Sequence, residues 1–131
     1  MKNWFNYKGT ISGKTYLFRS LLAGIPLLIV YALLIETNYY AGSVFYFFVL
    51  LTLFSFRYKR MSAVFKNKID FGKKLFYITT SIELLIAVYY LFDVELGQSE
   101  DVTPIDLLEL PSAIFVSFIL FKDSGIEKHN G

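Results

Sequence analysis

The sequence predicts an all-α fold: a four-helix transmembrane bundle that forms one integral membrane domain over residues 1–131. Three observations predict it. Hydrophobic residues make up 55% of the chain and charged residues 18%, which leaves too few polar side chains to cover a soluble domain. Four apolar runs each have about the length that a helix needs to cross a bilayer. Basic residues are concentrated in alternate segments outside these runs, which is typical of multi-pass membrane proteins.

The first two apolar runs are predicted to form helices at about 15–36 and 39–57. The first contains LLAGIPLLIVYALLI, and the second begins with YYAGSVFYFFVLLTLFSF, a stretch without charge. Asn38 and Gly42 bracket the very short connection between them, and both residue types are common in turns. This spacing predicts a tight antiparallel hairpin.

The last two apolar runs are predicted to form helices at about 74–92 and 104–122. The third run, LFYITTSIELLIAVYYLF, has one charge, and the fourth, PIDLLELPSAIFVSFILF, has acids only in its first two turns. Thr103–Asp106 has the pattern of a capping box that begins the fourth helix. We expect Pro111 to kink this helix and Gly125 to end it.

The segment GTISGKT, which is Gly9–Thr15, resembles a phosphate-binding loop. That pattern needs a further glycine where this chain has Lys8, and it follows a buried strand, for which the preceding residues leave no room. We interpret the segment as flexible chain that leads into the first helix, with Ser12 or Thr15 as its N-cap.

The distribution of basic residues predicts the orientation of the bundle. The N-terminal segment 1–19 and the connection 57–74 are rich in Lys and Arg, whereas the connection 93–106 contains acids and no base. The positive-inside rule places both termini and the connection 57–74 in the cytoplasm, with 93–106 outside. The predicted arrangement is therefore N-in and C-in.

The connection 57–74 is also predicted to form a basic amphipathic segment between the second and third helices. Tyr58, Met61, Phe65 and Ile69 recur at helical spacing between its cations. Such a segment lies in the membrane interface, and each nearby cation is attracted to the anionic leaflet. The alternative is a solvated loop whose charges only set the topology. The cations expected to contact anionic lipid are Arg57, Lys59, Arg60, Lys66, Lys68, Lys73 and Lys74.

One carboxylate interrupts the third helix near the middle of the membrane. Glu83 shares a helix face with Thr79, Thr80 and Tyr90, and Arg19 in the first helix is a candidate partner. A charge at this depth is costly and faces the interior of a bundle. We hypothesise either a protonatable site on an ion or substrate path, or a neutral or hydrogen-bonded carboxyl that joins helices. For Arg19, the alternative is a side chain that extends to the inner surface.

The residue types argue against an enzyme. The chain has no Cys, and its one His is His129. The sequence contains no Ser/His/Asp set, no pair of catalytic carboxylates and no zinc motif. Asp106 and Glu109 lie one turn apart, as is ordinary near a helix N-terminus. We therefore predict no catalytic residue, no cofactor and no metal.

The start of the chain, FNYKGTISGKTY, resembles that of small bacterial inner-membrane proteins grouped as domain-of-unknown-function family 805. The aromatic, glycine and serine positions of that opening are matched by Tyr7, Gly9, Ser12 and Tyr16. Lys59-Arg60-Met61 resembles the first half of a cytoplasmic motif of the family, whose His and Asp are replaced here by Ser62 and Ala63. The tail DSGIEKHNG resembles the family's ending. The resemblance implies four helices in a bacterial inner membrane and no assigned activity.

These observations predict a small multi-pass protein of the bacterial inner membrane that is not an enzyme. We expect it to associate with anionic lipids of the inner leaflet, and with a protein partner or further copies of itself, but not with nucleic acid. The alternative is a small transporter or channel component that uses the carboxylate of Glu83.

Overall fold

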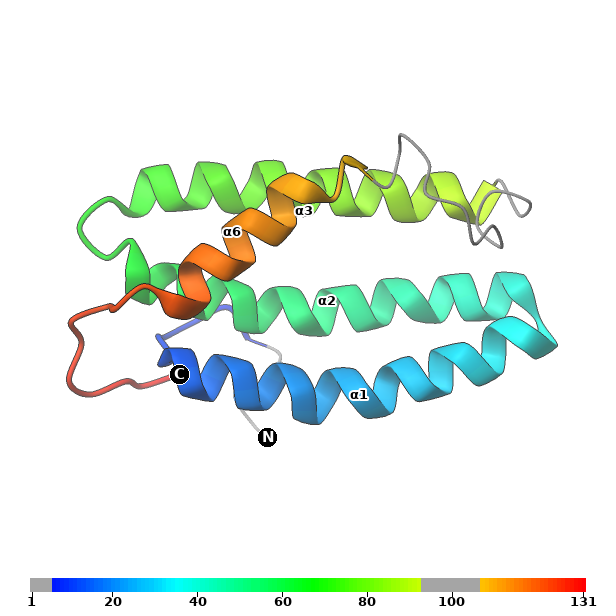
Figure 1. Cartoon of the computed structure of the whole chain (residues 1–131), viewed down its shortest axis with the longest axis horizontal. Helices are drawn as coiled ribbons and strands as arrows, with labels where there is room; N and C mark the ends of the chain where they lie inside the picture. Colours follow the sequence, from blue (N-terminus) through cyan, green and yellow to red (C-terminus); the bar gives the residue numbers. More distant parts are fainter. Residues whose placement is uncertain (1–5, 93–106) are drawn as a thin grey trace.

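The described part of the chain is entirely helical. The computed structural model describes residues 6–92 and 107–131, and within these ranges it contains four helices and no strand. The helices are α1 (Gly13–Thr37), α2 (Tyr39–Val64), α3 (Ile69–Phe92) and α6 (Leu110–Phe121). Figure 1 shows α1, α2 and α3 side by side along the long axis, with α6 crossing them obliquely. The predicted all-α class is confirmed.

Three of the helices are long and apolar enough to cross a membrane. They are α1, α2 and α3, with 25, 26 and 24 residues. Large apolar side chains cover their outward faces: Phe18 is 65% exposed and Leu85 is 69% exposed. Lipid is the solvent that such a surface requires. The helical pattern and hydropathy therefore define a membrane protein.

The fourth helix is shorter than predicted. Within the described residues, α6 has 12 residues, which span about 18 Å and not the roughly 30 Å of a bilayer core. The predicted helix 104–122 starts outside the described residues, as does the capping motif Thr103–Asp106. The described portion packs against all three long helices.

The end of the bundle at the α2–α3 turn differs from the prediction. Helix α2 continues to Val64 instead of ending near residue 57, and α3 begins at Ile69 instead of near residue 74. Lys and Arg are good helix formers, so the cationic residues extend both helices. Only residues 65–68 connect them, and Gly72 packs so closely on Phe65 that an added Cβ would lie 2.7 Å from the Phe65 Cβ. There is no separate amphipathic helix between α2 and α3.

Two sequence signals at helix N-termini are confirmed. Asn38 alone separates α1 from α2, and its side-chain oxygen accepts a hydrogen bond from the Ala41 N–H at 3.2 Å. Ser12 is the N-cap of α1, because its Oγ accepts from the Thr15 N–H at 3.1 Å. The segment that resembled a phosphate loop is therefore the start of a helix.

Two predicted signals near α6 were wrong. Pro111 does not kink a longer helix: it lies in the first turn of α6, after a turn at Leu108 and Glu109. Its missing N–H has no cost in that position. The helix ends at Phe121, and Gly125 lies beyond it in a left-handed conformation with φ +64. Gly125 therefore shapes the tail and does not cap α6.

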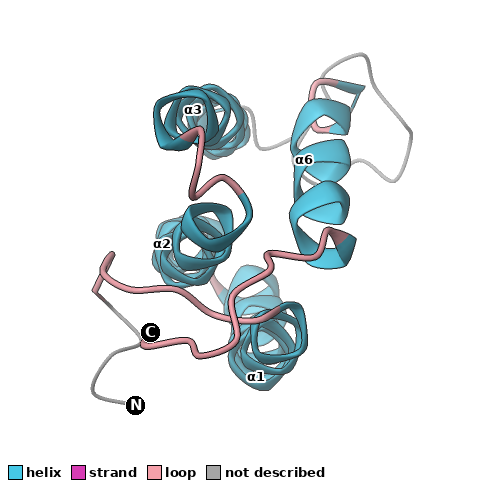
Figure 2. Cartoon of the chain, turned by 90° about the vertical axis from the view of Figure 1, so that its left-hand side faces the viewer, coloured by secondary structure: helices cyan, strands magenta, loops and turns pink. Residues whose placement is uncertain are grey.

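The core lies where all four helices meet, around the second half of α2. Figure 2 shows α2 between α1 and α3, with α6 to one side of this row. Phe56 and Met61 of α2 are fully buried, as is Ile119 of α6. A polar contact adds to this packing, because the Ser112 hydroxyl donates to the Thr79 main-chain oxygen at 3.1 Å. Such hydrogen bonds hold helices together where the surrounding solvent is lipid.

We predict that Gly42→Ala destabilises the α1–α2 hairpin by about 1–3 kcal/mol, as overpacking does elsewhere. A Cβ at Gly42 would lie 2.7 Å from the Ile35 Cα, which is main chain and cannot move alone. Gly24→Ala is the matched control, since its Cβ would meet only Leu53 Cδ2 at 3.7 Å. The measurement is the free energy of unfolding in mixed micelles. Equal stability of the two variants would contradict the close approach.

Candidate functional site

An ion pair joins α2 to α3 inside the bundle. Arg57 Nη1 donates to Glu83 Oε1 at 2.7 Å, and the two side chains are 10% and 13% exposed. Arg57 lies about 10 Å along α2 from its last residue, Val64, and Glu83 about 21 Å along α3 from Ile69. The Arg57 side chain must therefore extend toward the middle of the bundle. The pair lies within two helices that are each long and apolar enough to cross a membrane.

The surroundings of the pair are partly aromatic. The Phe54 ring centroid lies 5.1 Å from the Arg57 guanidinium carbon, a distance that permits a cation–π interaction. The Arg57 Nε is buried and has no hydrogen-bond partner within the described residues. One face of the guanidinium is thus covered by a ring and one donor faces no acceptor. A charge in this position is stable only because Glu83 neutralises it.

Tyrosines from α1 and α2 complete this polar cluster. Tyr16 is 6% exposed, and its hydroxyl interacts with the side chains of Arg57 and Ser20. Tyr46 is close enough to Glu83 and Glu109 to interact with both carboxylates. The cluster therefore connects α1, α2, α3 and the residue that precedes α6. It contains hydroxyls and carboxylates but no thiol and no imidazole.

The five residues proposed from the sequence as an intramembrane polar site do not form one site. Glu83 meets Arg57, whereas Arg19 Nη1 donates to the main-chain oxygen of Gly131 at 3.0 Å. Thr79 and Thr80 donate their hydroxyls to carbonyls of their own helix. Tyr90 lies farther along α3, where its main-chain oxygen accepts the Tyr39 hydroxyl. Arg19, the candidate partner of Glu83, therefore does not pair with it.

Sequence reasoning missed Arg57 as the partner of Glu83 because it placed the end of the second helix at that residue. A helix that continues to Val64 puts Arg57 nearly two turns inside it. Arg57 then shares a face with Phe54 and Met61, both of which are buried. A cation on an apolar face and a carboxylate on the next helix are the signal that identifies such a pair. Tyr16 and Tyr46 carried no comparable signal.

The described cations gather at one end of the bundle. The chain has 13 Lys and Arg residues, and all except Lys2 lie in the described ranges. They occur at the start of α1, the end of α2, the start of α3 and the tail after α6, which meet at one end (Figure 1). At the opposite end, the one charged residue in the described part of the chain is Glu36. The bundle is electrically polar along its long axis.

Three of the seven cations proposed to contact lipid are inside the protein. Lys59 is 0% exposed, Arg60 3% and Arg57 8%. They lie on the face of α2 that packs against the other elements and so do not meet lipid headgroups. Met61 is also buried, and the remaining members of the apolar stripe pack against the core instead of against lipid tails. Those members are Tyr58, Phe65 and Ile69.

Arg60 holds three separate segments together. Its Nε donates to the Ile119 carbonyl at 2.6 Å, its Nη1 to the Ile11 carbonyl at 3.2 Å, and its Nη2 to the Lys122 carbonyl. The carbonyls at the end of a helix lack partners within the helix and carry partial negative charge. Arg60 therefore caps the C-terminal end of α6 and attaches it to the segment before α1. Gly13 permits this approach, because an added Cβ would lie 2.6 Å from the Leu120 oxygen.

The remaining cations of the predicted lipid-binding set face outward. Lys66, Lys68 and Lys74 are exposed, and Lys73 is partly exposed. Lys66 and Lys68 lie in the turn at residues 65–68, and Lys73 and Lys74 follow it near the start of α3. This exposed group is called the lysine rim below. Its ammonium groups are available to an anionic surface, whereas the buried cations are not.

The C-terminal segment 124–131, called the strap below, folds back onto the chain before α1. The Gly131 N–H donates to the Thr10 carbonyl at 2.8 Å, and the Thr10 N–H donates to Asn130 Oδ1 at 3.1 Å. His129 Nδ1 lies 3.2 Å from the Thr10 hydroxyl. Partial burial and the positive charge of Arg60 lower the pKa of His129 from its ordinary value. Both effects favour the neutral imidazole at this position.

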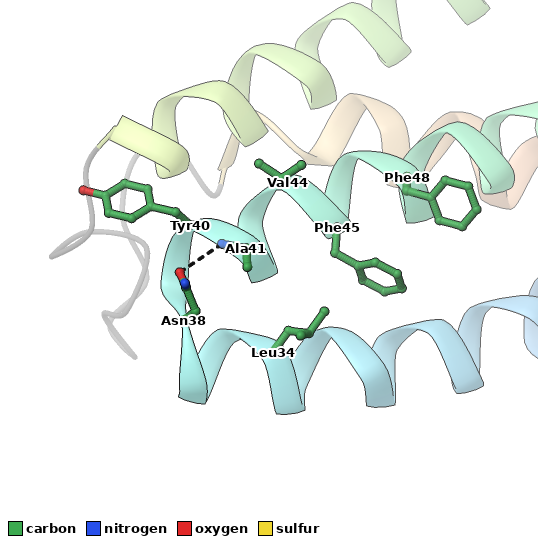
Figure 3. Close-up of a pocket in the computed structure, with 7 residues that line it drawn as sticks. All are labelled: Leu34, Asn38, Tyr40, Ala41, Val44, Phe45 and Phe48. Carbon is green, nitrogen blue, oxygen red and sulfur yellow. Dashed lines mark hydrogen bonds between the residues drawn. The ribbon is translucent and has the colours of Figure 1, made fainter.

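An apolar groove lies at the opposite end of the α1–α2 hairpin. Figure 3 shows its lining residues along the first turns of α2, with Leu34 near the end of α1 and the Asn38 cap between the two helices. The residues are Leu34, Asn38, Tyr40, Ala41, Val44, Phe45 and Phe48. None of these side chains is a carboxylate, imidazole or amine. The described residues also contain no group of three or more His, Cys, Asp or Glu arranged to hold a metal ion.

Comparisons with known proteins add no family to this description. No family model, no curated protein and no solved structure matches the chain. The resemblance to domain-of-unknown-function family 805 therefore stays a prediction.

We predict that Glu83→Gln destabilises the protein by about 3–5 kcal/mol, because it leaves the Arg57 charge buried without its carboxylate. Replacing both residues by Met removes both charges, and this double variant should lose less stability than Glu83→Met or Arg57→Met alone. Glu36→Gln, at an exposed glutamate, is the control and should change stability by less than about 0.5 kcal/mol. A double-mutant cycle on the free energy of unfolding in micelles measures the coupling. Additive single effects would show that the pair has no energetic role.

Proposed function

We propose that this protein is a non-enzymatic, multi-pass component of a bacterial cytoplasmic membrane that associates with anionic lipids and binds a partner through its cationic end. The observation that carries the proposal is the separation of its cations into two groups. Arg57 and Arg60 are buried and satisfied by Glu83 and by main-chain carbonyls. The lysine rim is exposed around the α2–α3 turn. The partner is a membrane protein or a second copy of this chain.

The charge distribution supports an N-in and C-in orientation. The segment before α1, the α2–α3 turn and the strap meet at one end, since Gly131 bonds to Thr10 and a Cβ at Gly125 would lie 3.3 Å from Lys66 Nζ. This end carries the described Lys and Arg residues, and retention of cationic segments in the cytoplasm is the general rule for multi-pass proteins.

We predict that a cysteine at Thr37, at the weakly charged end, reacts with a membrane-impermeant maleimide in intact bacterial cells. A cysteine at Asn67, in the α2–α3 turn, should react only after the membrane is permeabilised. Both positions are exposed, and the chain has no native Cys to interfere. The measurement is mobility shift after labelling. The reverse pattern would place the cationic end outside and would overturn the proposed contact with the inner leaflet.

We predict that the triple variant Lys66→Gln, Lys68→Gln and Lys74→Gln loses the preference of the protein for anionic over neutral lipid. Each cation at a charged leaflet contributes about 1 kcal/mol, so three should change the relative affinity by about two decades. Lipid binding is measured by native mass spectrometry from mixed phosphatidylglycerol and phosphatidylcholine micelles. The control replaces the same three lysines by Arg, which keeps the charge. If the Gln variant retained the preference, the lysine rim would not be the lipid-binding surface.

A second candidate function, a small transporter or channel component, has one specific observation in its favour. The Arg57–Glu83 pair lies within two helices that are each long and apolar enough to cross a membrane, and the buried Arg57 Nε has no acceptor among the described residues. Intramembrane ionisable groups often mark ion paths. This function requires a proton-dependent flux in proteoliposomes that Glu83→Gln abolishes. We rank it second because the ion pair already accounts for the Glu83 charge.

A further inference from the structure

The strap contacts Arg19, a cation that the proposed lipid association does not use. Arg19 Nη1 donates to the main-chain oxygen of Gly131 at 3.0 Å. Arg19 is near enough to Lys59 for the two charges to repel each other, and Asp123 is the acid that interacts with Arg60. The strap therefore places an oxygen atom against a region of positive potential. Its acids are few, since Glu127 is the one carboxylate side chain within 124–131.

The Arg19 guanidinium can reach lipid headgroups if the cationic end faces a leaflet. Arg19 is six residues into α1, or about 9 Å from Gly13, and its side chain is partly exposed. The polar region on each side of a hydrocarbon core is about 5–8 Å thick. The Arg19 Cα therefore lies at the edge of the apolar layer, and its long side chain extends back to the phosphate oxygens. Arg19 also differs from Arg60, whose three donors are enclosed by carbonyls.

We propose that the strap and the phosphate group of an anionic lipid compete for Arg19, so that lipid binding releases the strap from the start of α1. This inference rests on the proposed function, because it requires the cationic end to face an anionic leaflet. The Gly131 main-chain oxygen occupies the position of one phosphate oxygen. A phosphate offers several oxygens and matches the fork of a guanidinium, which makes its hydrogen bonds to Arg stronger than ordinary ones.

The strap is attached weakly enough to be displaced. Its hydrogen bonds to the rest of the chain are made through residues 129–131, on Thr10 and Arg19. Glu127, Lys128 and Asn130 are exposed, and the one large apolar side chain of this segment, Ile126, is only partly buried. The main chains approach directly, because an added Cβ at Gly9 would lie 2.9 Å from the Gly131 Cα. Exposed main-chain contacts of this kind open locally at low free energy.

The test uses the full chain with cysteines at Thr10 and His129. Their side chains are in contact, since His129 Nδ1 lies 3.2 Å from the Thr10 hydroxyl, so oxidation should cross-link the strap in its seated position, and reduction should free it. Binding of phosphatidylglycerol and phosphatidylcholine is measured by native mass spectrometry before and after reduction. We expect the oxidised protein to bind phosphatidylglycerol several-fold more weakly than the reduced protein, with no change for phosphatidylcholine. Adding Arg19→Gln should abolish this difference, whereas Lys122→Gln, at an exposed cation outside the strap, should preserve it.

Each outcome supports or overturns the proposal. Failure to cross-link would show that the strap is not seated, and equal phosphatidylglycerol binding in both redox forms would show that it does not compete. A further outcome is that inorganic phosphate at matched ionic strength prevents cross-linking to the same extent as phosphatidylglycerol. In that case the ligand would be a free anion and the lipid assignment would be wrong. A reduced protein without any preference for phosphatidylglycerol would instead refute the proposed function, so the two failures are distinguishable.

Discussion

The bundle depends on hydrogen-bond acceptors for the cationic side chains of α2 that lie in its interior. Arg57 and Arg60 both lie on the packed face of α2, where water cannot solvate them. Arg57 is neutralised by Glu83 of α3, and Arg60 donates hydrogen bonds to carbonyls at the end of α6 and before α1. Each contact joins α2 to a different part of the chain. Because an unpaired buried charge is far more costly than a missing apolar contact, these contacts determine which elements pack around α2.

Composition and periodicity were sufficient to predict the helical class and most helix boundaries. The single-residue hairpin at Asn38 and the Ser12 cap followed from local chemistry, since each side chain bonds to a main-chain N–H three residues ahead. The ends of α2 and α3 could not be predicted in this way. A run of Lys and Arg is compatible with a loop or with a helix, and only tertiary packing of Phe65 and Met61 on Gly72 decides between them.

The candidate site was predicted less well, for a related physical reason. Glu83 was identified because a carboxylate in an apolar run is conspicuous, but its partner is set by helix rotation and by the reach of a long side chain. Arg57 looked like one of seven similar cations. The positive-inside rule explains how many cations gather at one end, but it does not say which of them are exposed. Which cations are buried and which are exposed depends on which face of α2 packs against the other helices. The sequence alone does not specify these contacts between helices.

The depth of each buried charge has a consequence for how the helices assemble. Before packing, Arg57 and Arg60 lie close enough to the end of α2 to extend their side chains to the interface. Glu83, about 21 Å along α3, has no such route. Docking of α3 on α2 must therefore bring the Arg57 guanidinium inward to meet Glu83. The ion pair forms only when the two helices are correctly rotated, so it selects this arrangement against other pairings of equally apolar surfaces.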